Sequence, residues 1–454
     1  PAGASGTASE GARIPASLDL ALTDHWLPAP VRAWIEGQAL ALPAEVRETA
    51  NREEGADLTT YLTPAYALGT ASRTYSIGQD DFYVEHQANH LLLHYARPGA
   101  SAPWGMLYSR YVVNDRHYGT ISAAPDRPPN AFYDQGHFGA VQQRNKAIAL
   151  YALQAQHEEV SSLKTVVAFR LARPSAGLDE IWLGGRRVGA GDLPLDVAPG
   201  EWLVVADGAV YAGVRPLQPG CLGREAPIVL EQGPEGELWL TIYNYRGPAK
   251  RFWDYASLRG AFWRGNLRAG YILEVAERGA YPSAAAFLDH LRSASVQDET
   301  GPGPESPLVR TVTYGSGGDE LRLRYDLWHT RPLDRRLNGL PYHPPALESP
   351  VAAQGSSGEL RAGSATLRTA PQPRWLLAQE LDPASRAWVA VNPQDTPTAL
   401  RLETPLGTVT AARWGVGSIE WRAPAGGAQT LVLDTLEDPA ELRVPEGVRV
   451  IRAG

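Results

Sequence analysis

The chain has 454 residues, a length that is typical of two or three domains, and its formal net charge at neutral pH is −8. Hydrophobic residues make up 44% and charged residues 20%, which excludes a disordered or strongly charged polypeptide. A sequence pI near 5.8 leaves no basic field to displace counterions from phosphates, so we expect no nucleic acid partner.

The N-terminal region, residues 1–59, is predicted to hold a poorly ordered tail followed by short helices. Between residues 23 and 37, a capping residue, two prolines and apolar residues spaced by three and four predict one helix. A second short helix is predicted around residues 43–51. Two short helices cannot form a domain alone, so we expect them to brace the β-rich region that comes after them in the chain.

From residue 60 the pattern changes to strand segments separated by Gly, Pro and Asn, such as SLKTVVAFRL, GELWLTIYNY and GYILEVAE. Because no long helices separate these segments, their spacing favours antiparallel sheets over βαβ units. One helix is predicted at residues 282–292, with Ser283 as its N-cap.

Residues 296–309 belong to an acidic, Gly- and Pro-rich stretch and are predicted to be a linker. Residues 310–454 hold a further series of strand segments, in which apolar and polar residues alternate cleanly, as in LRLRYDLW and GSIEWRA. Such alternation is typical of sheets that face solvent on one side, so we expect a compact C-terminal β-sandwich.

Six of the ten histidines lie between His86 and His157, in a region rich in Tyr and Asn, which indicates a polar cleft. His86, His90 and His94 are spaced by four and could share a metal on a helix. On a strand, four residues rise about 13 Å, which is too far for common ligation. Because HLLLHYARP has the pattern of a strand that ends at a turn, we expect separate histidines and no metal.

The same region supplies the residue types that β-elimination of uronates requires. Arg or Asn neutralises the sugar carboxylate, His or Tyr removes the C5 proton, and Tyr protonates the leaving oxygen. The candidates for these catalytic roles are Tyr66, His86, His137 and Arg144. The alternative is a sheet whose polar outer face carries these side chains without chemistry.

A second cluster, at residues 242–265, combines aromatic side chains with arginines. Aromatic faces stack on sugar rings, and guanidinium groups bind carboxylates or sulfates through paired hydrogen bonds. The candidates for substrate binding are Asn145, Arg251, Trp253 and Trp263, while packing between two sheets is the alternative for the other aromatics. Carboxylates that could form a glycosidase pair are also present, but no spacing relates them.

Cys221 is the single cysteine, so neither an intrachain disulfide nor a cysteine-based zinc site can form. Signatures of serine hydrolases, nucleotide-binding loops and zinc proteases are missing, and we expect no cofactor. No apolar stretch approaches the roughly 18 residues that span a bilayer. The chain begins at Pro1 without Met, which favours a processed N-terminus.

Four segments of the sequence carry a resemblance to a known family: TTYLTPAYALGTAS, QQRNKAIALYAL, VADGAVYAGVRPL and GYILEVAERGAYPSAAAFLDHLR. Together they resemble the β-rich half of heparinase II/III-like and related polysaccharide lyases, in which a helical toroid precedes an antiparallel supersandwich. The resemblance covers roughly residues 20–295. It implies a supersandwich over residues 60–295, an exported location and an acidic polysaccharide substrate. The HxHxD-like metal-site stretch of these enzymes has no counterpart here, so no catalytic residue is transferred.

The sequence therefore predicts a mainly β protein, with short helices, a large antiparallel supersandwich and a smaller C-terminal β-sandwich. We expect an extracellular or periplasmic protein that acts on or binds acidic polysaccharide. If it is an enzyme, the expected reaction is polysaccharide lyase-like elimination. The alternative is a non-catalytic surface, scaffold or carbohydrate-binding protein.

Overall fold

The structure is a computed structural model that describes residues 42–50, 56–72, 90–115, 136–153, 159–173, 177–220, 227–233, 236–250, 267–342, 346–350, 352–355, 358–369, 375–382, 385–393 and 396–453. Within these ranges the chain is mainly β and its strands pair antiparallel, apart from one parallel pair near the C-terminus. The predicted fold class, mainly β with large antiparallel sheets, is therefore confirmed. The chain divides into a larger unit, Asn51–His343, and a smaller unit made of Pro1–Ala50 and Pro344–Gly454.

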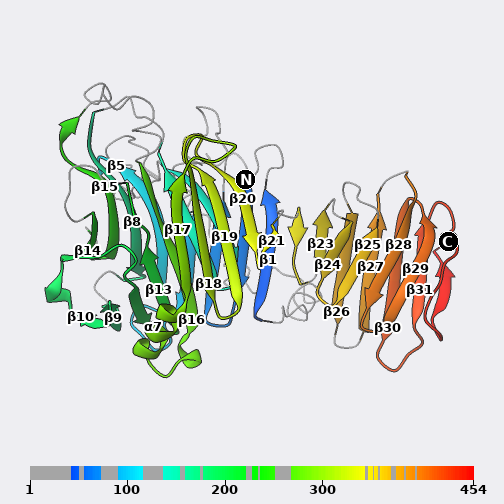
Figure 1. Ribbon diagram of the computed structural model, residues 1–454. Coiled ribbons are helices and arrows are strands. Elements are labelled where there is room, and N and C mark those ends of the chain that lie inside the picture. Colours follow the sequence, from blue (N-terminus) through cyan, green and yellow to red (C-terminus); the bar gives the residue numbers. More distant parts are fainter. Residues whose placement is uncertain are drawn as a thin grey trace, which may run out of the picture. The chain divides into compact units, whose positions relative to one another are not determined.

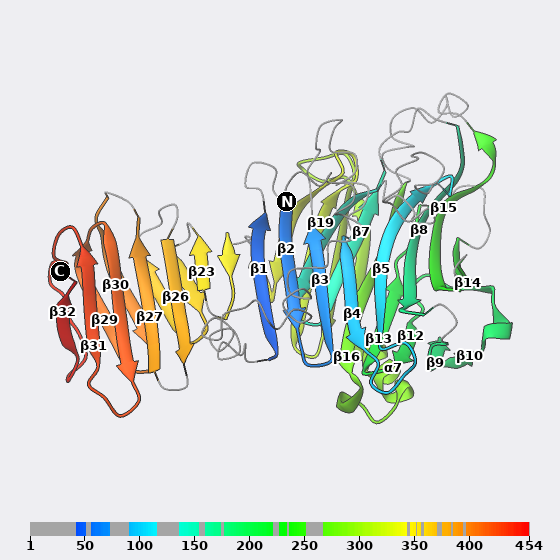
Figure 2. The ribbon, with the colours of Figure 1, turned by 180° about the vertical axis from the view of Figure 1, so that it is seen from behind.

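Three sheets are stacked in the larger unit, and Figures 1 and 2 show its two outer layers from opposite sides. The first sheet has the strand order β11-β14-β15-β8-β5-β4-β3-β2. Its strands are β2 (Ala56–Leu62), β3 (Tyr66–Ser72), β4 (Leu91–Ala96), β5 (Trp104–Val113), β8 (Val160–Leu171), β11 (Leu195–Asp196), β14 (Ile228–Gln232) and β15 (Leu238–Lys250).

The middle sheet has seven strands in the order β10-β9-β12-β13-β16-β7-β6. They are β6 (His137–Gln143), β7 (Lys146–Ala152), β9 (Glu180–Leu183), β10 (Arg186–Val188), β12 (Leu203–Asp207), β13 (Val210–Pro216) and β16 (Arg268–Glu277). Every residue of β7 is buried, because alternate side chains enter two different cores. Ala149 and Tyr151 pack towards the first sheet, whereas Ile148 and Leu150 pack towards the third. Coverage on both faces explains the unbroken apolar run of this strand.

The third sheet, called the outer sheet below, has five strands in the order β17-β18-β19-β20-β21 and faces the viewer in Figure 1. They are β17 (Ser295–Gly301), β18 (Val309–Ser316), β19 (Asp319–Asp326), β20 (Arg331–Leu337) and β21 (Leu340–Pro341). The helix α7 (Ala284–Ser293) buries Phe287 and Leu291 in the same core as Tyr314 of β18. Two 3-10 turns, η2 (Ala190–Asp192) and η4 (Arg278–Ala280), lie in the connections of this unit.

The smaller unit contains two sheets around a separate core, in which Trp388, Trp414 and Trp421 are completely buried. One sheet has the strand order β24-β25-β28-β29, and the other has the order β1-β22-β23-β26-β27-β30-β31-β32. The strands are β1 (Ala44–Ala50), β22 (Leu347–Glu348), β23 (Ala352–Gly355), β24 (Glu359–Ala362), β25 (Ala365–Thr369), β26 (Trp375–Asp382), β27 (Ser385–Asn392), β28 (Thr398–Thr404), β29 (Gly407–Trp414), β30 (Gly417–Pro424), β31 (Thr430–Thr435) and β32 (Arg449–Arg452).

The structure corrects two predicted elements and confirms a third. Residues 43–51, predicted as a helix, contain strand β1, which pairs with β22 through Arg47 and Glu348. Residues 296–309, predicted as a linker, begin in β17, which hydrogen-bonds along β18, so the smaller unit resumes at residue 344 rather than 310. The predicted helix at residues 282–292 is α7, and the Ser283 hydroxyl accepts a hydrogen bond from the Ala286 N–H at 3.2 Å.

The helix predicted between residues 23 and 37 lies outside the described residues. No helix in the part of the chain that the structure describes is long and apolar enough to cross a bilayer.

Candidate functional site

The predicted site residues fall into two groups. His86, Arg251, Trp253 and Trp263 lie outside the described residues. Tyr66, His137, Arg144 and Asn145 are described, and all four belong to the larger unit.

Tyr66 is the first residue of β3, and its side chain points into the core between the first and middle sheets. Burial raises the pKa of the Tyr66 phenol far above its ordinary value, and the nearby Tyr61, Glu277 and Glu274 raise it further. The phenol therefore stays protonated at physiological pH. It can donate a hydrogen bond but cannot remove a proton as a base.

Arg144 and Asn145 form the tight turn that joins β6 to β7. An Arg144 Nη atom lies 3.0 Å from Oδ1 of Asp319, on the outer sheet. The side-chain amide of Asn145 donates to the backbone oxygen of Val275 at 2.7 Å. Both side chains thus make contacts that tie the turn to neighbouring strands.

His137 begins β6, whereas Arg144 directly follows the end of the same strand. Seven extended residues span about 23 Å, so the two side chains lie at opposite ends of the middle sheet. Tyr66 lies nearer to Arg144, because the side-chain amide of Gln142 donates to the backbone oxygens of both Leu68 and Arg144. The structure therefore separates His137 from the other described candidates.

The other described histidines of this region do not share a site either. His90 is buried and stacks on Phe138, with ring centroids 5.1 Å apart. His94 is exposed on the solvent face of the first sheet, where it contacts Trp104. Among the described residues no group of three or more His, Cys, Asp or Glu side chains could hold a metal ion.

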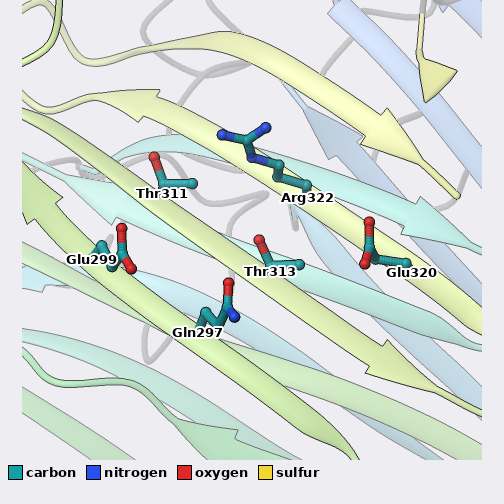
Figure 3. A pocket seen from close by; sticks show the side chains of 6 residues that line it. All are labelled: Gln297, Glu299, Thr311, Thr313, Glu320 and Arg322. Atoms are coloured by element: carbon teal, nitrogen blue, oxygen red, sulfur yellow. The ribbon is translucent and has the colours of Figure 1, made fainter. Parts of the chain in front are cut away.

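A shallow groove of about 260 Å³ lies on the solvent face of the outer sheet (Figure 3). It is lined by six polar side chains, which come from β17, β18 and β19: Gln297, Glu299, Thr311, Thr313, Glu320 and Arg322. The β17 wall of the groove lies in the segment for which the sequence predicts a linker.

The register of the three strands explains the groove. Val312 and Tyr314 point into the core, so Thr311 and Thr313 of β18 point to solvent. Thr313 pairs with Gln297 on one side and with Arg322 on the other. Because threonine is shorter than its neighbours, β18 forms the floor and the longer side chains of β17 and β19 form the walls.

The six side chains are available to a ligand. None of them makes a side-chain hydrogen bond or ion pair with another described residue, although their backbones are paired in the sheet. They offer two carboxylates, a guanidinium, an amide and two hydroxyls. Such a set can donate hydrogen bonds to, and accept them from, a ligand rich in hydroxyl groups.

The sequence carries a weak signal for this face. Polar residues alternate with apolar ones in β18 and β19, which predicts one solvent-facing row on each strand. That pattern does not show the order of the strands in the sheet. It is this order that places the polar rows of β17, β18 and β19 side by side. The comparisons with known proteins add no further assignment: no family model matches this chain, and no curated protein or solved structure matches it.

Proposed function

We propose that this protein binds polysaccharide without cleaving it and that a segment of the ligand lies in the groove along β18. The observation that carries the proposal is the groove itself, in which four longer polar side chains surround a floor of two threonines, and none of the six has a side-chain partner among the described residues. Sugar hydroxyls both donate and accept hydrogen bonds, so they match this mixture of groups. An exported location would suit such a ligand.

The charges in the groove define the sugars that it accepts. Glu299 and Glu320 supply two negative charges and Arg322 supplies one positive charge. A polyanion would meet net repulsion at this surface. The segment bound in the groove is therefore an uncharged part of the polysaccharide.

The placement of the predicted catalytic residues favours binding over elimination. Elimination requires a base and a group that neutralises the carboxylate to meet at one sugar. Tyr66 is buried and protonated, the guanidinium of Arg144 already pairs with Asp319, and His137 lies at the other end of β6. These three side chains support structural roles.

The proposal is tested by titrating the full chain with neutral oligosaccharides in a calorimeter. Thr313→Trp fills the floor of the groove, so we expect at least about a tenfold loss of affinity, or about 1.4 kcal/mol. Thr366→Trp is the matched control, because Thr366 lies on β25 of the smaller unit, and it should bind like the native chain. Equal affinity in the native and Thr313→Trp proteins would exclude the groove.

Catalysis is tested separately by following the ultraviolet absorbance of unsaturated uronates during incubation with acidic glycans. The binding proposal predicts no rise in absorbance. A rise that is abolished in both His137→Ala and Tyr66→Phe would instead support the lyase assignment.

A further inference from the structure

Arg215 of β13 and Arg310 of β18 lie in the layer between the middle and outer sheets. Tyr211 packs in the core that these sheets share, so Arg215, four residues further along the same face of β13, points towards the outer sheet. Val312 packs in the same core, so Arg310 points back towards the middle sheet. Arg310 is 1% exposed, whereas Arg215 is only partly buried and can be reached from solvent.

Among the described residues, one carboxylate binds this pair of arginines. Asp298, on the edge strand β17, accepts hydrogen bonds from Nε and Nη2 of Arg310 at 2.8 and 2.7 Å. No described residue forms an ion pair or a hydrogen bond with the guanidinium of Arg215. Burial lowers the pKa of Arg215, and Tyr314 and Asp298 offset this only in part. The guanidinium stays charged, so its positive charge is incompletely balanced.

The surroundings of the pair are positive as well. Arg268, at the start of β16, is on the same face of the strand as Ile272, which packs in the shared core. Burial lowers the pKa of Arg268, and the charge of Arg310 lowers it further. Asp298 raises that pKa, but by less than Arg310 lowers it. At Arg268, repulsion by a neighbouring cation therefore outweighs attraction by the carboxylate.

Buried N–H donors without acceptors occur in the same layer. The guanidinium of Arg215 lies 5.9 Å from the centre of the indole ring of Trp202, which is 3% exposed. Nε1 of Trp202, Nε of Arg215 and Nη1 of Arg310 are buried and have no hydrogen-bond partner among the described residues. A buried donor that is left unpaired lowers stability, so such groups are rare in folded proteins. All three atoms are donors, which indicates that the layer lacks an acceptor.

We propose that Arg215, together with the nearby donors of Trp202 and Arg310, forms a binding site for a phosphate group. Paired N–H groups of a guanidinium bind two phosphate oxygens. The remaining oxygens offer acceptors to the buried donors, and the negative charge of the phosphate balances Arg215. A carboxylate has only two oxygens, so the guanidinium alone would occupy it. The groove residues point to solvent from the opposite face of the outer sheet, so this site does not depend on the groove.

The test is calorimetric titration of the full chain with inorganic phosphate at constant ionic strength. The native chain should bind one phosphate, and Arg215→Gln should weaken binding about tenfold or more. Arg215→Lys keeps the charge but not the paired hydrogen bonds, so it should also lose affinity, with less risk to folding. Arg361→Gln is the matched control, because Arg361 is an exposed arginine on β24 of the smaller unit, and it should bind like the native chain.

Two further ligands define the chemistry of the site. Acetate should bind at least about tenfold more weakly than phosphate, because it has fewer acceptor oxygens. Glycerol phosphate that binds as tightly as inorganic phosphate would identify a phosphate ester of a larger molecule as the ligand, whereas weaker binding would identify the free ion. Both results support a phosphate site.

Three results would overturn the site: no binding of phosphate, equal affinities for acetate and phosphate, or equal phosphate affinities in the native chain and Arg215→Gln. The outcome can be separated from that of the groove. Thr313→Trp should leave phosphate binding unchanged, even if it abolishes binding of a neutral oligosaccharide, and Arg215→Gln should leave oligosaccharide binding unchanged.

Discussion

Lys146 of the middle sheet and Asp319 of the outer sheet form an ion pair, with Nζ of the lysine 2.8 Å from Oδ2 of the aspartate. Both residues are more than 90% buried. Arg144 binds the other oxygen of the same carboxylate, but its side chain is 56% exposed. One aspartate therefore balances a buried cation and an exposed one, and the two contacts should differ widely in strength.

Asp319→Asn should lower the free energy of unfolding by about 3–5 kcal/mol, because it leaves the Lys146 charge buried without a counterion. Arg144→Ala removes only the exposed contact and should cost at most about 1 kcal/mol. Urea denaturation of the two variants measures both effects. If Asp319→Asn and Arg144→Ala lowered the free energy of unfolding by similar amounts, the Lys146 ammonium group would be solvated rather than buried.

Two strand glycines of the first sheet should respond differently to replacement. A Cβ atom added to Gly105 would lie 2.3 Å from the ring of Tyr95, whose hydroxyl donates to Asp207 at 2.8 Å. The same atom added to Gly69 would meet nothing closer than 3.8 Å. Gly105→Ala should therefore cost about 1–3 kcal/mol of unfolding free energy. Gly69→Ala is the matched control and should change it by less than about 0.5 kcal/mol.

Thermal unfolding measures the stability of the two glycine variants. Hydrogen exchange of the backbone amides in β4, the strand that contains Tyr95, locates any disturbance. Faster exchange in Gly105→Ala alone would locate the disturbance at Tyr95. Equal thermal unfolding midpoints for Gly105→Ala and Gly69→Ala would mean that the Tyr95 ring moves away from the added methyl group without loss of stability.

Strand and helix patterns that depend on local sequence could be predicted. The apolar run at residues 162–171 became most of β8, and the capped segment at residues 282–292 became α7, because their own residues satisfy the relevant period. β1 could not be predicted, since AEVRETA is also a good helix sequence. It becomes a strand through pairing with β22, about 300 residues further along the chain.

The candidate site was harder to predict than the fold, for a related reason. Period-two alternation shows that Thr311 and Thr313 share a face, but it does not show which strands lie beside them. The Gly, Pro and acidic residues near β17 are typical of linkers, yet an edge strand also tolerates charged residues because its outer side is solvated. His137 and Arg144 are only seven positions apart, but an extended strand places them at opposite ends of the sheet.

The core of the smaller unit depends on a pair of tryptophans. The rings of Trp388 and Trp421 meet edge to face, with centroids 5.9 Å apart, and both are completely buried. Trp421→Ala should cost about 3–5 kcal/mol through lost burial and the cavity it leaves. Leu436→Ala, at an exposed position of the same unit, should cost less than about 0.5 kcal/mol. Denaturation curves of the two variants give the comparison, and equal midpoints would contradict the role of this core.

Asp326 should make the stability of the larger unit sensitive to acid. Burial by itself raises the pKa of its carboxyl, but hydrogen bonds from the Ser306 hydroxyl and from His329 and Trp328 outweigh burial and lower the pKa below its ordinary value. A group whose pKa is depressed in the folded state stabilises that state above its unfolded pKa, which is about 3.9 for Asp. This stabilisation is lost as the pH falls below about 4 and the carboxylate is protonated.

Asp326→Asn should therefore cost about 1–3 kcal/mol at neutral pH, because the neutral amide is a poorer partner for the hydrogen-bonding groups of Ser306, Trp328 and His329. The difference between the native chain and the variant should shrink as the pH falls from about 5 to about 3, since only the native chain has a carboxylate to protonate. Asp434→Asn is the control for the substitution itself, because Asp434 is exposed on β31 of the smaller unit, and it should change the free energy of unfolding by less than about 0.5 kcal/mol at neutral pH. Urea denaturation at several pH values supplies the curves. A constant difference between the native chain and Asp326→Asn across this range would mean that these hydrogen bonds stabilise the neutral acid as well as the anion.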